Sequence, residues 1–409
     1  MSTRRAFMKN SALAMFGVGT APAWLSRAAW AGAAGANRKK ILVAIFQRGA
    51  ADGLNVVVPF GEKRYYELRP TLSVADPSGK SESAAIDLDG FFGLHPALSP
   101  LKPLWDAKSL SFIHASGSPD TTRSHFDAQD YMESGTPGNK STSGGWLNRA
   151  LLPEPGIAAP LRAVSLGPSL PRTMRGKSSA VAVNTIADFR VRDAMSSSAF
   201  EAMYDKTSDT VLHGTGKDTF EAVKILKSIQ EQDTPPANGA SYPRGRFGQS
   251  MQQIARLIKA DVGIEVAFAD SGGWDTHFNQ TPQLSNLLTE FGLALAAFHR
   301  DLGDRMSDVA LITMSEFGRT AKENGTRGTD HGHANVMFAM GAGVRGGMAL
   351  GKWPGLETEQ LYEGRDLAVT TDFRDVLGEL VSKHLGNKNL DGVFPGYKVD
   401  ERNFRGVLG

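Results

Sequence analysis

The sequence predicts an α/β protein that is built on a doubly wound, mostly parallel sheet with helices on both faces. Several short runs are apolar at every position, as expected for strands that are buried on both sides. Between them lie segments whose apolar residues recur at three- and four-residue spacing, which is typical of amphipathic helices. Strands that alternate with helices in this way favour a parallel sheet.

The first predicted strand covers residues 41–46, which read Ile-Leu-Val-Ala-Ile-Phe and lead into a polar turn. We expect the other strands at residues 109–114, 163–166, 264–269, 309–314 and 336–340. The expected helices are residues 126–133, 220–230, 248–259, 283–302 and 372–385. Polar, glycine-punctuated stretches at residues 76–89, 136–145 and 233–244 are expected to be loops. Residues 151–244 have weak periodicity, and we interpret them as an inserted cap.

The N-terminus has the features of a twin-arginine export signal. Arg4 and Arg5 precede a small residue, an aromatic residue, an apolar residue and a lysine, which is the pattern that the twin-arginine translocon recognises. The apolar stretch at residues 12–25 is short and broken by glycine and proline, and a small-x-small cleavage motif ends at Ala31. We therefore expect residues 1–31 to be a signal peptide and residues 32–409 to be the mature domain, located in the periplasm or secreted. The alternative is an amphipathic helix or an uncleaved anchor.

Composition excludes several classes of site. The chain contains no cysteine, which rules out disulfides, thiolate metal sites and cysteine nucleophiles. Its formal net charge is +2, and removal of the basic residues of the signal changes this to about −2. We therefore expect neither a nucleic-acid partner nor, in the absence of a later long apolar segment, a stable membrane span.

Polar residues follow the predicted strands, at the sheet edge where sites of α/β proteins lie. Asp52 follows the first strand, and Ser124 precedes His125 at the start of a helix. A helix N-terminus favours an oxyanion or a phosphate, although Ser124 is also explained as an ordinary N-cap. Asp275 and His277 lie two residues apart after the strand at 264–269, a spacing that suits two ligands of one metal ion or a simple turn.

Further oxygen and nitrogen ligands occur around the last two strands. Glu316 follows the strand at 309–314, and Asp330, His331 and His333 precede the strand at 336–340. Because several strand ends carry such residues, the pattern favours a metal site over scattered surface polarity. Lone histidines in turns or strands, such as His95 and His114, are more often structural.

Four motifs make the chain similar to a known family. Residues 46–55, 123–129, 273–277 and 315–320 resemble the exported family called domain of unknown function 1501. The order of Asp52, Ser124, the Asp275/His277 pair, the Ser-Glu-Phe-Gly motif at residues 315–318 and His331 also looks like that of the alkaline phosphatase and sulfatase superfamily. The resemblance implies an alkaline-phosphatase-like fold.

The superfamily resemblance further implies a divalent metal cofactor, one or two ions of Zn, Mn, Mg or Ca. Asp275, His277 and His331 would bind the first ion, and Asp52 with Glu316 a second one. Phe317 stands where that superfamily usually has a metal-binding histidine, so His125 or His333 would have to replace it. Ser124 would be the nucleophile, and Arg48 or Arg123 would bind the phosphoryl oxygens.

We therefore expect an exported metal-dependent hydrolase of phosphate esters, which acts on a small-molecule or polymer substrate. Sulfate esters are less favoured, because the chain has no cysteine and Ser118-Pro119-Asp120 lacks the spacing of a formylglycine motif. The alternative is a non-catalytic, metal-stabilised protein of the same fold that serves binding or assembly in the cell envelope.

Overall fold

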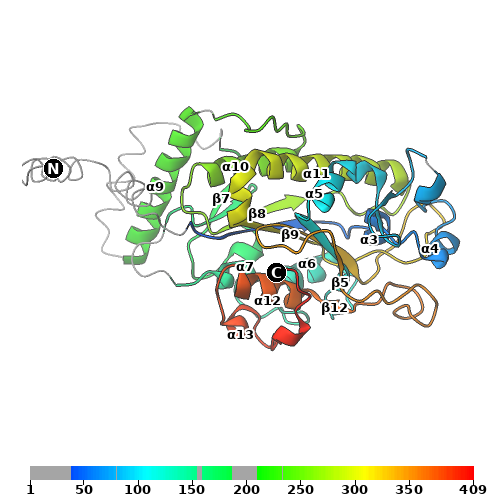
Figure 1. Ribbon diagram of the computed structural model, residues 1–409. Helices are drawn as coiled ribbons and strands as arrows, with labels where there is room; N and C mark the ends of the chain where they lie inside the picture. The colour runs from blue at the N-terminus through cyan, green and yellow to red at the C-terminus, as the bar shows by residue number, and fades with distance from the viewer. Residues whose placement is uncertain (1–37, 80, 154–158, 187–209, 233) are drawn as a thin grey trace, which may run out of the picture.

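The computed structural model describes residues 38–79, 81–153, 159–186, 210–232 and 234–409. The predicted signal peptide, residues 1–31, lies outside the described residues. Nine strands form a central sheet in the order β11-β5-β10-β9-β1-β8-β6-β7, and β12 pairs with β5 (Figure 1). Their bounds are β1 Ile41–Gln47, β5 Leu110–Gly117, β6 Ala163–Leu166, β7 Val181–Val183, β8 Val266–Ser271, β9 Val309–Met314, β10 Asn335–Gly341, β11 Ala349–Leu350 and β12 Thr371–Asp372.

The sheet confirms the predicted fold class, with one antiparallel member. β1 pairs in parallel with both β8 and β9, whereas β10 runs antiparallel to β9 and β5. An antiparallel neighbour needs no crossover helix. The chain from β9 to β10 accordingly returns through a loop without any α-helix, and this loop supplies part of the site described below.

Helices cover both faces of the sheet (Figure 1). One face carries α5 (Lys102–Asp106), α10 (Arg246–Lys259) and α11 (Gln280–Leu302), and the other carries α6 (His125–Ser134), α7 (Trp146–Ala150), α12 (Phe373–Lys383) and α13 (Leu390–Val393). The remaining elements are α3 Gly53–Val56, α4 Lys63–Leu68, α9 Thr210–Gln232, a small sheet of β2 Val57–Val58, β3 Ile86–Asp87 and β4 Gly93–Leu94, and the 3₁₀ helices Pro77–Gly79, Pro96–Leu101, Arg172–Met174, Gly303–Asp308 and Glu401–Asn403. None of the described helices is long and apolar enough to cross a membrane.

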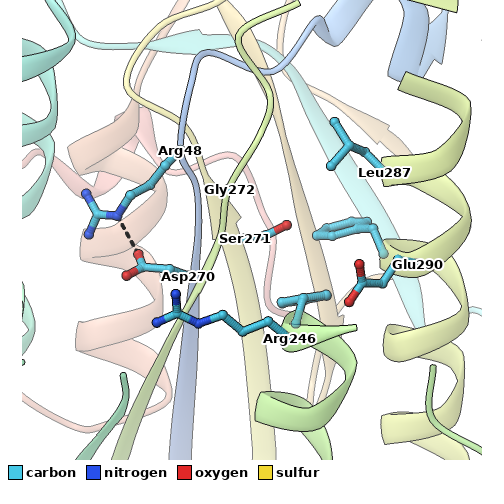
Figure 2. Close-up of a pocket in the computed structure, with 9 residues that line it drawn as sticks. Arg48, Arg246, Asp270, Ser271, Gly272, Leu287 and Glu290 are labelled. Carbon is cyan, nitrogen blue, oxygen red and sulfur yellow. Dashed lines mark hydrogen bonds and ion pairs between the residues drawn. The ribbon is translucent and has the colours of Figure 1, made fainter. Parts of the chain in front are cut away.

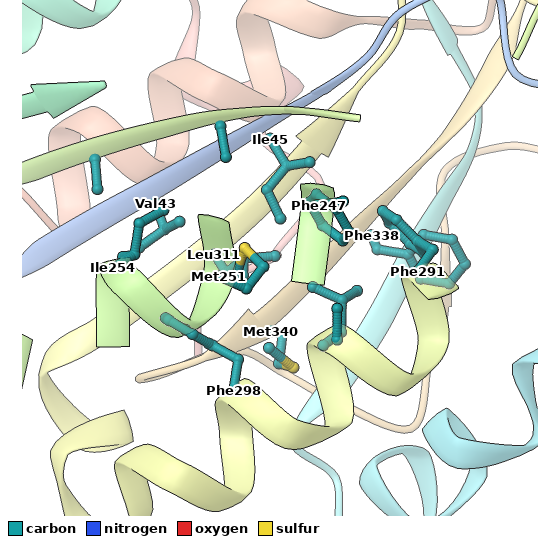
Figure 3. Packing of buried hydrophobic residues seen from close by; sticks show 14 of the residues in the cluster. Val43, Ile45, Phe247, Met251, Ile254, Phe291, Phe298, Leu311, Phe338 and Met340 are labelled. Carbon is teal, nitrogen blue, oxygen red and sulfur yellow. The ribbon is translucent and has the colours of Figure 1, made fainter. Parts of the chain in front are cut away.

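The alternating direction of side chains along β1 explains why its residues 41–46 are all apolar. Val43 and Ile45 belong to the core under α10 and α11, in the same cluster as Met251 and Phe291 (Figure 3). Leu42, Ala44 and Phe46 belong to the second core, on the opposite face of the sheet. Because successive side chains of a strand point to opposite faces, a strand that is covered on both sides needs an apolar residue at every position.

The segment that we interpreted as a cap contributes to the sheet itself. Within residues 151–244, β6 pairs with β8, and β7 extends the sheet beyond β6. β6 and β7 are therefore part of the central sheet, in which β6 is fully buried and β7 at its edge is partly buried. Residues 154–158, 187–209 and 233 of the same segment lie outside the described residues.

Candidate metal centre

Three loops meet where β1, β8 and β9 end, because these neighbouring strands are parallel and in register. Gln47 at the end of β1 is opposite Ser271 at the end of β8, and Phe46 is opposite Met314 at the end of β9. The loop after β8 carries Asp275 and His277, while the loop between β9 and β10 carries His331. The first turn of α6 adds a fourth side chain from another part of the fold.

That fourth side chain is His125, the first residue of α6. Its Nε2 lies 3.0 Å from the Nε2 of His331, which lies 3.0 Å from the Nε2 of His277. The carboxylate of Asp275 lies 2.9 Å from the Nε2 of His277, 3.3 Å from that of His331 and 3.5 Å from that of His125. Among the described residues, one group of possible metal ligands has ligand atoms that all lie within 4.8 Å of one another, and it consists of His125, Asp275 and His331.

The other ring nitrogen of each histidine contacts an acceptor. The Nδ1 of His125 lies 2.9 Å from the Oε1 of Glu316, and the Nδ1 of His277 lies 3.2 Å from the Oδ1 of Asp330. The Nδ1 of His331 lies 2.9 Å from the backbone carbonyl oxygen of Arg123. Carboxylates and carbonyls accept but do not donate hydrogen bonds, so each Nδ1 carries the proton. In the neutral rings each Nε2 then presents a lone pair.

Three lone pairs and one carboxylate therefore converge with no proton between them. Such a set of acceptors repels itself unless a cation binds among them or the rings are protonated. Histidines that bind metal through one nitrogen and donate from the other to a carboxylate or carbonyl are the usual arrangement at metal sites. At a tetrahedral site with metal–nitrogen bonds of about 2.1 Å, neighbouring ligand atoms are about 3.4 Å apart. His125, Asp275 and His331, whose ligand atoms all lie within 4.8 Å of one another, thus fit one divalent ion of the zinc or manganese type, and His277 lies beside this group.

The surroundings shift the pKa values of the ligands in different directions. The hydrogen bond to Glu316 raises the pKa of His125 above its usual value, whereas burial lowers the pKa of His331. Burial would raise the pKa of Asp275, but Arg319 and His277 outweigh it and hold the pKa below the usual range. The Nη1 of Arg319 donates to Asp275 at 2.9 Å. Asp275 is therefore a carboxylate at neutral pH.

Glu316 supports His125 rather than facing the centre directly. Its Oε1 accepts from the backbone N–H of Gly49 at 2.8 Å and from the side chain of Gln129 at 2.9 Å, and its Oε2 accepts from Ser315 at 3.0 Å. The next residue, Phe317, packs against His125 with ring centroids 5.0 Å apart. An apolar ring thus occupies the place where the superfamily resemblance implies a histidine.

Asp52 does not join the centre, so the structure does not assemble the second metal site that we expected. The buried Asp52 carboxylate accepts from the Nη1 of Arg69 at 2.6 Å and from the Nε2 of Gln280 at 2.5 Å. A guanidinium neutralises this carboxylate in place of a metal ion. His333 also lies apart from the centre, because its ring stacks on Tyr362 with centroids 4.6 Å apart.

The two arginines expected to bind phosphate are already paired. The Nε of Arg48 donates to Asp270 at 2.6 Å, and its Nη2 lies 2.9 Å from Glu133. The Nη2 of Arg123 donates to Asp366 at 2.7 Å and to Glu363 at 2.8 Å. Arg48 and Arg123 therefore position parts of the fold, and neither guanidinium is free to bind a substrate without exchanging partners.

Ser124 is exposed and is the N-cap of α6. Its Oγ accepts from the backbone N–H of Asp127 at 3.5 Å, a long contact. Because it directly precedes His125, its hydroxyl lies at the same helix end as a ligand of the centre. Ser124 thus caps α6 and is also the neighbour in the chain of a ligand of the centre.

Gln280 connects the two ligand loops, and no pattern in the sequence indicates this role. It is the first residue of α11 and is fully buried. Its Oε1 accepts from the hydroxyl of Thr276 at 2.9 Å and from that of Thr329 at 2.7 Å, while its Nε2 donates to Asp52. Thr276 lies between two ligands, and Thr329 comes two residues before His331.

A cavity of about 380 Å³ lies beside the same loop (Figure 2). Asp270, Ser271 and Gly272 line one wall, and α11 contributes Leu287 and Glu290. Burial raises the pKa of Asp270. The remaining lining residues are Arg48, Arg246, Phe247 and Phe291. Arg48 connects this cavity to the centre, because its Nη1 also donates to Gln129, which bonds Glu316.

Comparisons with known proteins confirm the family resemblance. The model of DUF1501, a protein of unknown function, matches residues 110–389. No curated protein sequence matches the chain.

Three solved structures show weak similarity. A protein in the alkaline phosphatase superfamily from Vibrio parahaemolyticus is 11% identical over 76% of this chain and 62% of its own, with a TM-score of 0.31. The lipoteichoic acid synthase LtaP from Listeria monocytogenes is 8% identical over 86% and 73%, with a TM-score of 0.37. A 2-O GAG sulfatase is 12% identical over 89% and 76%, with a TM-score of 0.29.

Proposed function

This chain belongs to DUF1501, a protein family of unknown function, and we propose that it is a metal-dependent hydrolase of phosphate esters with Ser124 as the nucleophile. One observation carries the proposal. The Nε2 atoms of three histidines lie close to the Asp275 carboxylate, and the Nδ1 of each ring donates to an acceptor. Asp275, His277 and His331 would hold the ion, with His125 as a further ligand.

A bound divalent ion would supply Lewis-acid stabilisation of negative charge on the phosphoryl group. The chain's own contribution begins with α6, whose first N–H groups and positive dipole end favour a phosphoryl oxygen near His125. Arg319 would keep Asp275 ionised and oriented. Glu316 would hold the imidazole of His125 so that its Nε2 faces inward.

Ser124 would attack from the same helix end. Its Oγ forms a bond to phosphorus while the bond from phosphorus to the alcohol oxygen breaks. The hydroxyl proton passes to solvent, and the departing oxygen takes a proton from water. A water molecule then cleaves the phosphoserine, which restores the hydroxyl and releases phosphate.

The twin-arginine motif supports a periplasmic or secreted location for this activity, with the translocon as a transient partner. Proteins that use this route fold before export, which suits a centre that must bind its metal inside the cell. Phosphate is favoured over sulfate as the ester class, because the chain has no cysteine and no formylglycine motif.

A second function is supported by two specific observations. Phe317 contacts both His125 and His331, and the guanidinium groups of Arg48 and Arg123 are committed to carboxylates. These features suit a metal-stabilised binding or assembly protein that lacks a phosphoryl clamp.

Kinetics of Ser124 variants separate the two functions. If Ser124 is the nucleophile, Ser124→Ala lowers turnover of a chromogenic aryl phosphate by at least about 10³-fold, while metal content stays at the wild-type level. Ser124→Gly is the matched control, since glycine keeps most of the capping preference and has no hydroxyl. Turnover by the glycine variant would refute the nucleophile, and a metal-loaded wild type that hydrolyses neither mono- nor diesters would favour the binding protein.

A further inference from the structure

Two exposed phenylalanines each follow a histidine of the candidate metal centre in the chain. Phe126 follows His125 and is 89% exposed, and Phe278 follows His277 and is 65% exposed. In the described part of the chain, the other exposed large apolar residues are aliphatic or methionine, and each is at most 42% exposed: Leu152, Leu293 and Met348. Within the described ranges, the two most exposed large apolar side chains thus each follow a histidine of one site in the chain.

The backbone that carries each ring is fixed, so the exposure is not a property of a loose loop. Phe126 lies in the first turn of α6, where Ala128 N–H donates to the carbonyl of Ser124 at 2.9 Å. The carbonyl of His277 accepts from Asn324 and from Thr326, both at 2.8 Å. The carbonyl of Phe278 accepts from Gln283 at 2.6 Å.

Neither ring contributes the stability that burial of an aromatic side chain normally gives. Single exposed apolar residues are ordinary on protein surfaces, but here two exposed rings each follow a histidine of the same polar centre. The Nε2 atoms of His125 and His277 both contact His331, so the two backbones approach the centre from different elements, α6 and the loop after β8.

We propose that Phe126 and Phe278 form an aromatic rim that binds the apolar alcohol part of the ester, so that the preferred substrates are phosphate esters of alkyl or aryl alcohols. The inference rests on the proposed function, because the phosphoryl group must lie at the metal centre for its alcohol part to reach the rim. The rim is a specificity element and takes no part in the bond-breaking step.

The test uses n-alkyl phosphonates, which cannot be hydrolysed at phosphorus, and measures their binding to the metal-loaded mature protein by calorimetry. From methyl- to octylphosphonate we expect Kd to tighten by about twofold per methylene, roughly half of what full burial gives. In the double variant F126S/F278S, Kd should no longer depend on chain length. The variant should retain the wild-type metal content and the wild-type Kd for methylphosphonate.

Two further variants serve as controls. F126L/F278L keeps an apolar border and should keep the chain-length dependence. L293S removes an exposed apolar side chain from the middle of α11, about 20 Å along the helix from Gln280, and should change nothing.

The possible failures are distinct. Equal Kd values across the series in the wild type would overturn the rim and leave the proposed function standing. Absence of binding by every phosphonate would overturn the proposed function and the rim with it. An unchanged series in F126S/F278S, accompanied by a change in oligomeric state, would show that the rim contacts a second copy of the chain instead of the substrate.

Discussion

Replacement of Gln280 by leucine should weaken the fold and the metal centre together. Gln280→Leu keeps the size and helix preference of the side chain but removes the donor to Asp52 and the acceptor of Thr276 and Thr329. The Oδ1 of Asp52 already has no hydrogen-bond partner within the described structure. Each buried polar group that loses its partner costs about 1–3 kcal/mol, and with partial relaxation of the loops we expect the variant to lose about 3–5 kcal/mol of unfolding free energy.

The effect on metal binding follows from the same contacts. Thr276 lies between Asp275 and His277, so loss of its hydrogen bond loosens two ligands at once. Outer hydrogen bonds of this kind typically change metal affinity by about 10- to 100-fold. We therefore expect Zn²⁺ or Mn²⁺ to bind Gln280→Leu at least about tenfold more weakly than the wild type.

Denaturant titration of the chelator-treated protein measures the first effect, and metal titration of the folded protein measures the second. Gln249→Leu, on the exposed face of α10, is the matched control. Gln280→Glu tests the direction of the pH dependence of stability, because the introduced carboxyl group can donate to Asp52 only while it is protonated. This variant should lose stability as the pH rises and two carboxylates face each other. Equal denaturation midpoints for Gln280→Leu and Gln249→Leu would refute the reasoning.

The remaining predictions concern export, acid stability and the turn after β1. Replacing both Arg4 and Arg5 by lysine should leave the folded protein in the cytoplasm, and fractionation that finds it in the periplasm would exclude the twin-arginine route. Burial lowers the pKa of His114 to about 4, so below pH 6.5 the unfolded chain binds a proton that the folded protein excludes. Stability should fall from pH 6.5 towards pH 4, and His114→Gln should reduce that slope by up to about 1.4 kcal/mol per pH unit; parallel curves would contradict this. Gly49 has φ +112°, and a Cβ there would lie 2.7 Å from the backbone nitrogen of Asp275, so Gly49→Ala should lose at least about 1–3 kcal/mol and bind metal more weakly. Wild-type metal affinity in Gly49→Ala would show that the turn does not position Asp275.

The strands were predictable where burial on both faces imposes an apolar run. β6 and β9 have the predicted bounds, whereas β8, Val266–Ser271, begins and ends two residues later than the predicted residues 264–269. The antiparallel direction of β10 was not predictable, since the strand has the same apolar composition as its parallel neighbours. Direction depends on the connection, and the polar chain between β9 and β10 contains no helix signal.

The site was predictable to the extent that parallel strand ends gather in one place. That rule brought Asp275, His277 and His331 together. It failed for Asp52, because the partner Arg69 lies in the chain just after α4 and nothing in the sequence shows that its guanidinium reaches a buried carboxylate. It also gave too little weight to His125, since the first residue of a helix can face either solvent or the sheet edge, and only the packing of α6 decides which.

The central claim is that His125, Asp275, His277 and His331 bind a divalent ion, and metal analysis of purified protein tests it most directly. We expect on the order of one tightly bound ion per chain in the wild type and a much smaller amount in His331→Ala, which removes the imidazole that contacts both other histidines. His333→Phe, two residues away and outside the centre, should keep its ion because a phenyl ring preserves the stack on Tyr362. Equal metal content in the wild type and His331→Ala would contradict the account.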